Sequence, residues 1–203
     1  MYSSIQSFCD DVTQNFNSIS QERKEILDKI TEYVRSKVQA NKAVQLVYVC
    51  THNSRRSHFG QVWAHVASRY YAIPNVSTFS GGTEATAFNI NAINALKKIG
   101  FEVKQDGEKN PLYKLYFDEQ ESAIECFSKV YNDAKNPQKD FAAIMTCSDA
   151  EDNCPFIPGV ELRIATTYND PKAFDNTPLQ DEKYSERCKQ IATEIFYLFS
   201  KVK

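Results

Sequence analysis

One short segment of the sequence holds residue types that together can bind and attack an oxyanion. It reads Cys50-Thr51-His52-Asn53-Ser54-Arg55-Arg56-Ser57 and places a cysteine six residues before an arginine. A cysteine thiolate is a strong nucleophile. A guanidinium group donates two parallel hydrogen bonds to two oxygens of a phosphate-like anion. The segment therefore predicts a cysteine-nucleophile enzyme that acts on a tetrahedral oxyanion, although this spacing alone is a weak signal.

The residues on either side of this segment strengthen the interpretation. Residues 44–49 form a mostly apolar run typical of a strand buried in a parallel sheet, and a helix pattern starts at Ser57. A loop from a strand into a helix turns backbone N–H groups toward one point, and the helix N-terminus adds partial positive charge. This field favours the thiolate form of a cysteine. The alternative is a buried cysteine that ends a strand, followed by two solvated arginines on a helix.

The predicted loop assigns different tasks to its side chains. We expect the Arg56 guanidinium to bind the anion from inside the loop and the Arg55 side chain to point away. Ser57 is placed to donate a hydrogen bond to the Cys50 sulfur, and Asn53 to hold the loop backbone. The predicted oxyanion-binding residues are Thr51, His52, Asn53, Ser54, Arg55, Arg56 and Ser57.

Two further cysteines, Cys147 and Cys154, lie seven residues apart. Cys147 follows a predicted core strand, so it should reach the same sheet edge as Cys50. The polar stretch 148–153 between the two is typical of a mobile surface loop. A redox relay needs one thiol that reaches the primary sulfur and a second that reaches the first. The alternative is two unrelated cysteines; two thiolates at this spacing with no nearby histidine make a poor zinc site.

The elements that must position these residues alternate between strand and helix. Alternation of this kind indicates an α/β fold with a mostly parallel sheet covered on both sides. The predicted strands cover residues 44–49, 76–80, 141–146 and 162–165, and the predicted helices start at Ser57, cover residues 89–99 and cover about 181–202.

Two segments fall outside this alternation. Residues 1–42 read as helical, with Ser20 as the N-cap of a helix over about 21–39. Apolar and aromatic residues between 111 and 133 suggest an inserted β-hairpin.

Composition excludes several other functions. The 203 residues are 42% hydrophobic and 25% charged, with a formal net charge of -2. Neither nucleic-acid binding nor membrane binding is expected from these values. The N-terminus lacks a basic start and an apolar run, so we expect no secretory signal and a cytoplasmic protein. Six cysteines are too sparse for a disulfide scaffold, and we expect Cys9, Cys126 and Cys188 to be structural.

The segment from Cys50 to Ser57 resembles the loop C-x-x-N-x-x-R-S shared by low-molecular-weight protein tyrosine phosphatases and thioredoxin-coupled arsenate reductases. The ordered motifs that continue the resemblance are Ser80-Gly81-Gly82-Thr83-Glu84-Ala85, Asn89, Thr146-Cys147-Ser148-Asp149-Ala150, Cys154-Pro155 and Asp170-Pro171. It implies a three-layer sandwich around a four-stranded, mostly parallel sheet, with a catalytic domain over residues 43–203. Residues 1–42 would then be an N-terminal helical extension; neither they nor residues 108–135 have a counterpart in the compact family members.

The resemblance to the reductases implies a three-cysteine relay without a metal or another cofactor. Cys50 would attack arsenate while Asp170, as in the family, protonates the leaving oxygen. Cys147 would then attack Cys50, releasing arsenite and leaving a disulfide. Cys154 would attack Cys147, and thioredoxin or a similar thiol reductant would reduce the resulting Cys147–Cys154 disulfide. Asn-Asp-Pro is also an ordinary turn signal, so Asp170 has a purely structural alternative.

The phosphatase is the alternative function, hydrolysing phosphate monoesters through a phosphocysteine. It would use the same loop and Asp170 without the other two cysteines. In tyrosine phosphatases of the family tyrosines follow the Asp-Pro, whereas here residues 172–174 read Lys-Ala-Phe, so a tyrosine substrate is disfavoured. Phe88 remains a candidate for one aromatic wall of a phosphotyrosine pocket.

Three departures from the reductases concern His52, Arg55 and Gln61. His52 stands where reductases often have a glycine, and Arg55 stands where some have a further cysteine. Gln61 stands where some reductases have a cation-binding glutamate, so we expect no bound alkali metal. A protein that only senses oxyanions, or a redox-regulated module that binds partners through residues 1–42, is a third possibility. The combination of a nucleophile, an arginine and an acid argues against it.

Overall fold

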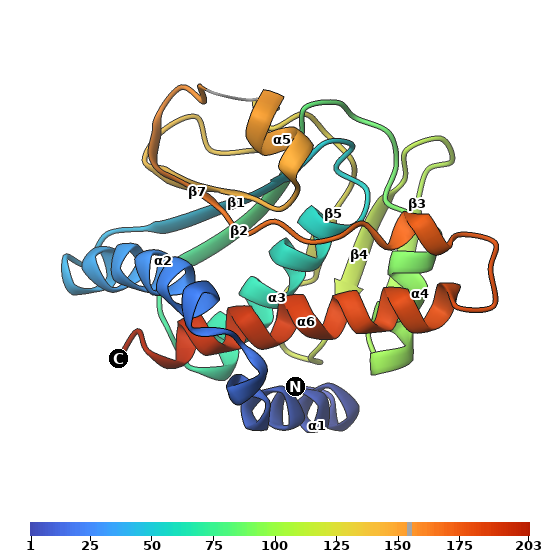
Figure 1. Ribbon diagram of the computed structural model, residues 1–203, viewed down its shortest axis with the longest axis horizontal. Coiled ribbons are helices and arrows are strands. Elements are labelled where there is room, and N and C mark those ends of the chain that lie inside the picture. The colour runs from blue at the N-terminus through green and yellow to red at the C-terminus, as the bar shows by residue number, and fades with distance from the viewer. Residues whose placement is uncertain (154–155) are drawn as a thin grey trace.

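The computed structural model describes residues 1–153 and 156–203, and its centre is a four-stranded parallel sheet (Figure 1). The strand order is β2-β1-β6-β7, and all three neighbouring pairs are parallel. The strands are β1 (Val44–Cys50), β2 (Val76–Gly82), β6 (Phe141–Met145) and β7 (Val160–Ala165). The prediction of a mostly parallel four-stranded sheet is confirmed.

Side chains of the sheet alternate between two apolar layers, because successive residues of a strand point to opposite faces. Leu46, Tyr48 and Ile144 pack with residues of α3 (Arg56–Tyr70) and α6 (Gln180–Ser200). On the opposite face, Val47, Val49 and Met145 pack with Ala150 of α5 (Ser148–Asn153) and with Ile157. Figure 1 shows α5 on one side of the sheet and α3 and α6 on the other. α4 (Ile90–Ile99) lies beside α6 and ends at Gly100, which has a positive φ of 119°.

The insertion forms a second, antiparallel sheet in the order β3-β4-β5. The expected hairpin corresponds to β4 (Leu112–Tyr116) and β5 (Ile124–Cys126), with Tyr113 opposite Cys126. The third strand, β3 (Glu102–Asp106), was not predicted. Its sequence, Glu-Val-Lys-Gln-Asp, is charged and almost fully exposed, so it lacks the apolar alternation that marks a strand.

The N-terminal residues are helical as predicted. They form α1 (Ser3–Gln14), a short 3₁₀ turn η1 (Phe16–Ser18) and α2 (Gln21–Gln39). Ser20 caps α2 by accepting a hydrogen bond from the Arg23 backbone N–H at 3.2 Å. Both helices pack against α6, and the Thr31 hydroxyl donates to the Leu198 carbonyl across 3.1 Å. The division between an extension at residues 1–42 and a catalytic domain at 43–203 stays a prediction.

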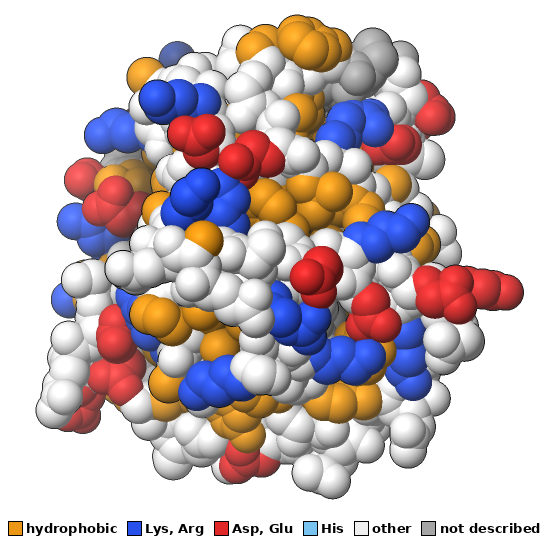
Figure 2. All heavy atoms as spheres, turned by 90° about the vertical axis from the view of Figure 1, so that its left-hand side faces the viewer, with side chains coloured by type: hydrophobic (Ala, Val, Ile, Leu, Met, Phe, Trp, Pro, Cys, Tyr) orange, Lys and Arg blue, Asp and Glu red, His pale blue; other side chains and the backbone are white. Residues whose placement is uncertain are grey.

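The surface carries both signs of charge. Figure 2 shows basic and acidic side chains interspersed over one face of the molecule, with hydrophobic side chains between them. Over the described ranges 1–153 and 156–203, no helix is long and apolar enough to cross a membrane.

Candidate active site

The predicted oxyanion loop connects the end of β1 to the start of α3. Cys50 is the last residue of β1 and is 3% exposed, and α3 begins at Arg56. The Ser57 Oγ lies 3.1 Å from the Cys50 Sγ. The Asn53 side-chain amide donates to the same oxygen across 2.8 Å, which leaves the Ser57 hydroxyl proton to point to the sulfur. The expected contact between Ser57 and the thiol is therefore present.

Asn53 fixes the shape of this loop. Its φ is 44°, in the left-handed region that asparagine tolerates better than most residues. Besides donating to Ser57, its side chain accepts a hydrogen bond from the Lys129 backbone N–H at 2.9 Å. Asn53 thus joins the loop to the end of the insertion, far away in sequence.

The chain after β2 closes over the loop. The backbone N–H groups of Thr83, Glu84 and Asn89 donate to carbonyls of residues 50, 51 and 54 at 3.2, 2.9 and 2.9 Å. A Cβ on Gly82 would lie 2.6 Å from the Thr51 carbonyl oxygen and 2.7 Å from the Asn53 nitrogen. Only glycine permits this approach of two backbones, which explains the second glycine of the Gly81-Gly82 motif.

The remaining loop residues are held by neighbouring segments. The Ser54 hydroxyl donates to the Ala87 carbonyl across 2.7 Å. The His52 carbonyl accepts from the hydroxyls of Thr86 and Ser128 at 3.1 and 3.0 Å. The His52 ring is partly exposed, 3.9 Å from the Glu84 carboxylate. Backbone and side chains around the loop therefore fix its conformation.

Arg56 and Asp170 meet, although they are 114 positions apart. Arg56 donates from Nη2 to Asp170 Oδ2 across 2.7 Å and from Nη1 to the Tyr168 carbonyl across 2.8 Å. Its Nε is buried and has no hydrogen-bond partner among the described residues. Asp170 also accepts from the Lys172 backbone N–H at 3.0 Å, capping the turn η2 (Pro171–Phe174). The site thus combines a fixed guanidinium, whose Nε has no partner in the described part of the chain, with a carboxyl group.

Cys147 lies beside the loop. β1 and β6 are neighbours, with Val49 opposite Met145, so Cys50 and Cys147 emerge at the same sheet edge. The Cys147 sulfur is buried, 3.4 Å from the Thr51 Oγ1 and 3.4 Å from the Ala150 backbone N. Cys154, the third predicted relay cysteine, lies outside the described residues.

The chain is similar in sequence to curated arsenate reductases. No family model matches the sequence. The chain is 27% identical over 140 residues to arsenate reductase from Bacillus subtilis (strain 168), covering 69% of this chain and 81% of that protein. It is 28% identical over 145 residues to arsenate reductase from Halalkalibacterium halodurans, covering 71% and 84%.

Solved structures show the same fold at low sequence identity. An arsenate reductase in the oxidized state has a TM-score of 0.52 at 16% identity, covering 78% of this chain and 98% of that one. A YwlE mutant from Bacillus subtilis has a TM-score of 0.53 at 12% identity, covering 78% and 97%. The chain is therefore similar in sequence to curated arsenate reductases, and it shares the fold of the low-molecular-weight phosphatases and arsenate reductases. Its fold is the three-layer sandwich of these proteins, extended by the N-terminal helices and the inserted sheet.

Arg55 contacts α6 and two carboxylates in a way that the sequence did not predict. Its side chain is nearly buried, and its Nε donates to the Tyr184 hydroxyl across 2.8 Å. Carboxylate oxygens of Asp170 and Asp175 lie 3.9 and 3.7 Å from its guanidinium nitrogens. Burial raises the pKa of Tyr184 to about 12, so the phenol keeps its proton and donates to Asp175 at 2.7 Å. Tyr184 and Asp175 were not among the predicted site residues, since an aromatic residue on a helix stripe reads as core.

Phe88 does not line an open pocket beside the loop. It is 3% exposed and stacks on the buried His58 ring, with the ring centroids 4.0 Å apart. This placement removes the one aromatic wall that the sequence offered for a phosphotyrosine.

The other described cysteines are buried in the core. Burial raises the pKa of Cys9, Cys126 and Cys188 to about 12 each, so they remain protonated thiols. The Trp63 Nε1 donates to the Cys188 sulfur across 3.2 Å. Within residues 1–153 and 156–203, no cluster of histidine, cysteine and acidic side chains is arranged to hold a metal.

Proposed function

We propose that this protein is an arsenate reductase that uses Cys50 as nucleophile and Cys147 and Cys154 as the following thiols of a relay. The observation that favours reduction over hydrolysis is the Cys147 sulfur, buried 3.4 Å from the hydroxyl of the residue that follows Cys50. A hydrolase needs no thiol at this place. The curated relatives named arsenate reductase agree with this proposal.

The first step joins the substrate to Cys50. The Cys50 thiolate forms a bond to arsenic, and one arsenate oxygen leaves as water after taking a proton from Asp170. Arg56 holds the remaining oxygens through the guanidinium that Tyr168 and Asp170 orient. Ser57 stabilises the thiolate before the attack.

The second step reduces arsenic. The Cys147 thiolate attacks the Cys50 sulfur, the sulfur–arsenic bond breaks, and its electron pair stays on arsenic, which leaves as arsenite. The product is a Cys50–Cys147 disulfide. Two sulfurs can bond when their Cα atoms lie within about 7 Å, and neighbouring strands of a sheet are about 4.8 Å apart. The positions of Cys50 and Cys147 at the ends of neighbouring strands suit this step.

The last steps restore the enzyme. Cys154 attacks Cys147 and frees Cys50, and a dithiol protein of the thioredoxin kind reduces the Cys147–Cys154 disulfide. We expect residues 148–153, which form α5, to be able to refold on oxidation so that the Cys147–Cys154 disulfide can form. We place the reaction in the cytoplasm, where such reductants keep thiols reduced.

The test is arsenate reduction with a thioredoxin system, run beside hydrolysis of an aryl phosphate. Cys50→Ser should abolish both activities. Cys147→Ser should stop arsenate turnover, and Cys154→Ser should permit one round and trap a Cys50–Cys147 disulfide that peptide mass mapping detects. Cys126→Ser is the matched control, because that thiol is fully buried in the inserted sheet. If the wild type hydrolyses aryl phosphate, leaves arsenate untouched and keeps Cys147 and Cys154 free under oxidation, the protein is a phosphatase.

A further inference from the structure

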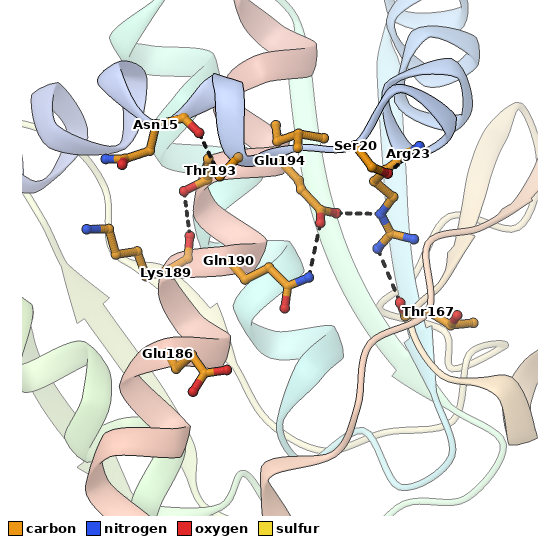
Figure 3. A pocket seen from close by; sticks show the side chains of 11 residues that line it. Asn15, Ser20, Arg23, Thr167, Glu186, Lys189, Gln190, Thr193 and Glu194 are labelled. Atoms are coloured by element: carbon orange, nitrogen blue, oxygen red, sulfur yellow. Dashed lines mark hydrogen bonds and ion pairs between the residues drawn. The ribbon is translucent and has the colours of Figure 1, made fainter.

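The segment that connects β7 to Asp170 is held in place from the N-terminal extension, residues 1–42. Arg23, in the first turn of α2, donates from Nη2 to the Thr167 carbonyl across 3.2 Å. Its guanidinium carbon lies 4.7 Å from the centre of the Tyr168 ring. Figure 3 shows Arg23 between Thr167 and Glu194 at the edge of a cavity of about 560 Å³. The same side chain thus contacts two successive residues of the segment.

Glu194 of α6 completes the network around Arg23. Its carboxylate accepts from Arg23 Nε at 2.8 Å, from the Tyr168 hydroxyl at 2.8 Å and from Gln190 Nε2 at 3.3 Å. Only 5% of its side chain is exposed, and a buried carboxylate is tolerated when charged and polar donors satisfy it. Burial and the Glu194 charge hold the pKa of Tyr168 well above its usual value, so the phenol stays a donor. The network therefore fixes the Tyr168 side chain.

The Tyr168 backbone continues the network into the site. Its carbonyl accepts from Arg56 Nη1, and Asp170, two residues further on, accepts from Arg56 Nη2. The backbone N–H groups of Thr166 and Tyr168 bond to the carbonyls of Met145 and Thr146 at 2.8 and 3.1 Å. The sheet thus holds one side of the segment, and Arg23 holds the other.

We propose that Arg23 is a positioning residue for Arg56 and Asp170. Through Arg23, the N-terminal extension helps to hold these two active-site residues in place. The inference rests on the proposed function in taking Arg56 as the anion-binding residue and Asp170 as the acid. Arginine suits the task better than lysine, because its planar group bonds the Thr167 carbonyl and Glu194 while it stacks on an aromatic ring.

Other contacts attach the extension without touching this segment. Arg35, also on α2, donates to the Lys201 carbonyl and pairs with Glu32, and Thr31 donates to the Leu198 carbonyl. These contacts lie at the far end of α6. Arg35→Lys is therefore a matched control for Arg23→Lys, with the same residue change on the same helix.

The experiment compares wild type, Arg23→Lys and Arg35→Lys by three measurements. These are hydrogen exchange of the amides of residues 166–170, calorimetric titration with inorganic phosphate, and arsenate turnover. Arg23→Lys keeps a positive charge for Glu194, so the protein should stay folded, which thermal unfolding checks. We expect faster exchange at Thr166 and Tyr168 and about tenfold weaker phosphate binding, which corresponds to about 1.4 kcal/mol of binding free energy. Turnover should fall with it, and Arg35→Lys should match wild type.

Each outcome decides a different point. Unchanged exchange at residues 166–170 in Arg23→Lys would overturn the positioning role, whatever the protein's activity. Faster exchange with unchanged phosphate binding and turnover would overturn the link from the segment to the site. If the wild type neither binds phosphate nor reduces arsenate, and Arg23→Lys still speeds exchange at residues 166–170, the proposed function is contradicted. The positioning of the segment by Arg23 is then retained.

Discussion

Arg55 donates its Nε–H to the Tyr184 hydroxyl across 2.8 Å, whereas its neighbour in sequence, Arg56, bonds the Tyr168 carbonyl and Asp170. The two adjacent arginines therefore have different hydrogen-bond partners, although the Asp170 carboxylate also lies 3.9 Å from the Arg55 guanidinium. Arg55 joins the loop to α6. Arg56 holds the segment that contains the acid.

Removal of each arginine should thus have a different main effect. Arg56→Ala should weaken phosphate or arsenate binding about 10- to 100-fold, since a hydrogen bond to a charged group contributes about 1.5–3 kcal/mol. Arg55→Ala should mainly lower the free energy of unfolding, by about 1–3 kcal/mol, because the Tyr184 and Asp175 groups lose their partner. Calorimetric titration and urea unfolding of both variants measure the two effects. Equal losses of anion affinity would contradict the assignment.

Ser57→Ala should slow the alkylation of Cys50 by iodoacetamide. The Ser57 Oγ lies 3.1 Å from the sulfur, and loss of one hydrogen bond worth about 1 kcal/mol should reduce the rate about fivefold. Ser54→Ala is the control from the same loop, because the Ser54 hydroxyl donates to the Ala87 carbonyl instead. Mass spectrometry of the Cys50 peptide over time gives both rates. Equal rates in wild type and Ser57→Ala would show that the hydroxyl does not stabilise the thiolate.

Gly82→Ala should distort the anion loop. The added Cβ would lie 2.3 Å from the Glu84 carbonyl oxygen and 2.6 Å from that of Thr51, so the backbone must move. We expect loss of phosphate binding in calorimetry together with a lower unfolding temperature. Gly107→Ala serves as a control, since its φ of 95° also disfavours alanine but its Cβ would meet only Pro111, at 3.7 Å. That variant should lose about 1 kcal/mol of stability and keep phosphate affinity.

Asp170→Asn should separate binding from chemistry. Asp170 accepts from Arg56 through Oδ2 and from the Lys172 N–H through Oδ1, and the single amide oxygen of asparagine can keep one of these bonds. With that oxygen turned to Arg56, phosphate affinity should change little. Turnover of arsenate should fall by about 100-fold or more, the usual contribution of a general acid. Asp175→Asn is the nearby control, because Asp175 bonds Tyr184. Wild-type turnover in Asp170→Asn would remove Asp170 from the reaction.

Buried His58 and half-buried His65 should make stability depend on pH. Burial lowers the pKa of His58 well below its ordinary value and that of His65 to about 4. The unfolded chain takes up these protons below about pH 6.5 while the native state does not, so stability falls as pH falls. Each histidine contributes up to about 1.4 kcal/mol per pH unit, and for His65 the loss levels off near pH 4.

His65→Gln tests this dependence. Urea unfolding should show a shallower decline for the variant than for wild type between about pH 6.5 and pH 4, and parallel curves above about pH 7.5. An equally steep decline in both proteins would mean that His65 is not buried in its neutral form.

Local patterns in the sequence determined the elements and the nucleophile loop. The apolar run at residues 44–49 precedes Cys50, Ser20 caps its helix, and Gly100 ends another, because strand burial, capping and left-handed turns each involve a few adjacent residues. Cys50 and Cys147 could be placed at one edge in advance, since the carboxyl ends of parallel strands share an edge. The charged strand β3 had no such pattern and was missed.

Only the tertiary structure decided which distant side chains complete the site. Three hydrogen bonds join residues separated by 129, 76 and 144 positions: those between Arg55 and Tyr184, Lys129 and Asn53, and Arg23 and Thr167. Tyrosine on a helix stripe and arginine near a helix start are ordinary residues at ordinary places, so no local pattern distinguishes them. Their contacts follow from how α2, α6 and the insertion pack on the sheet, and packing depends on the whole chain.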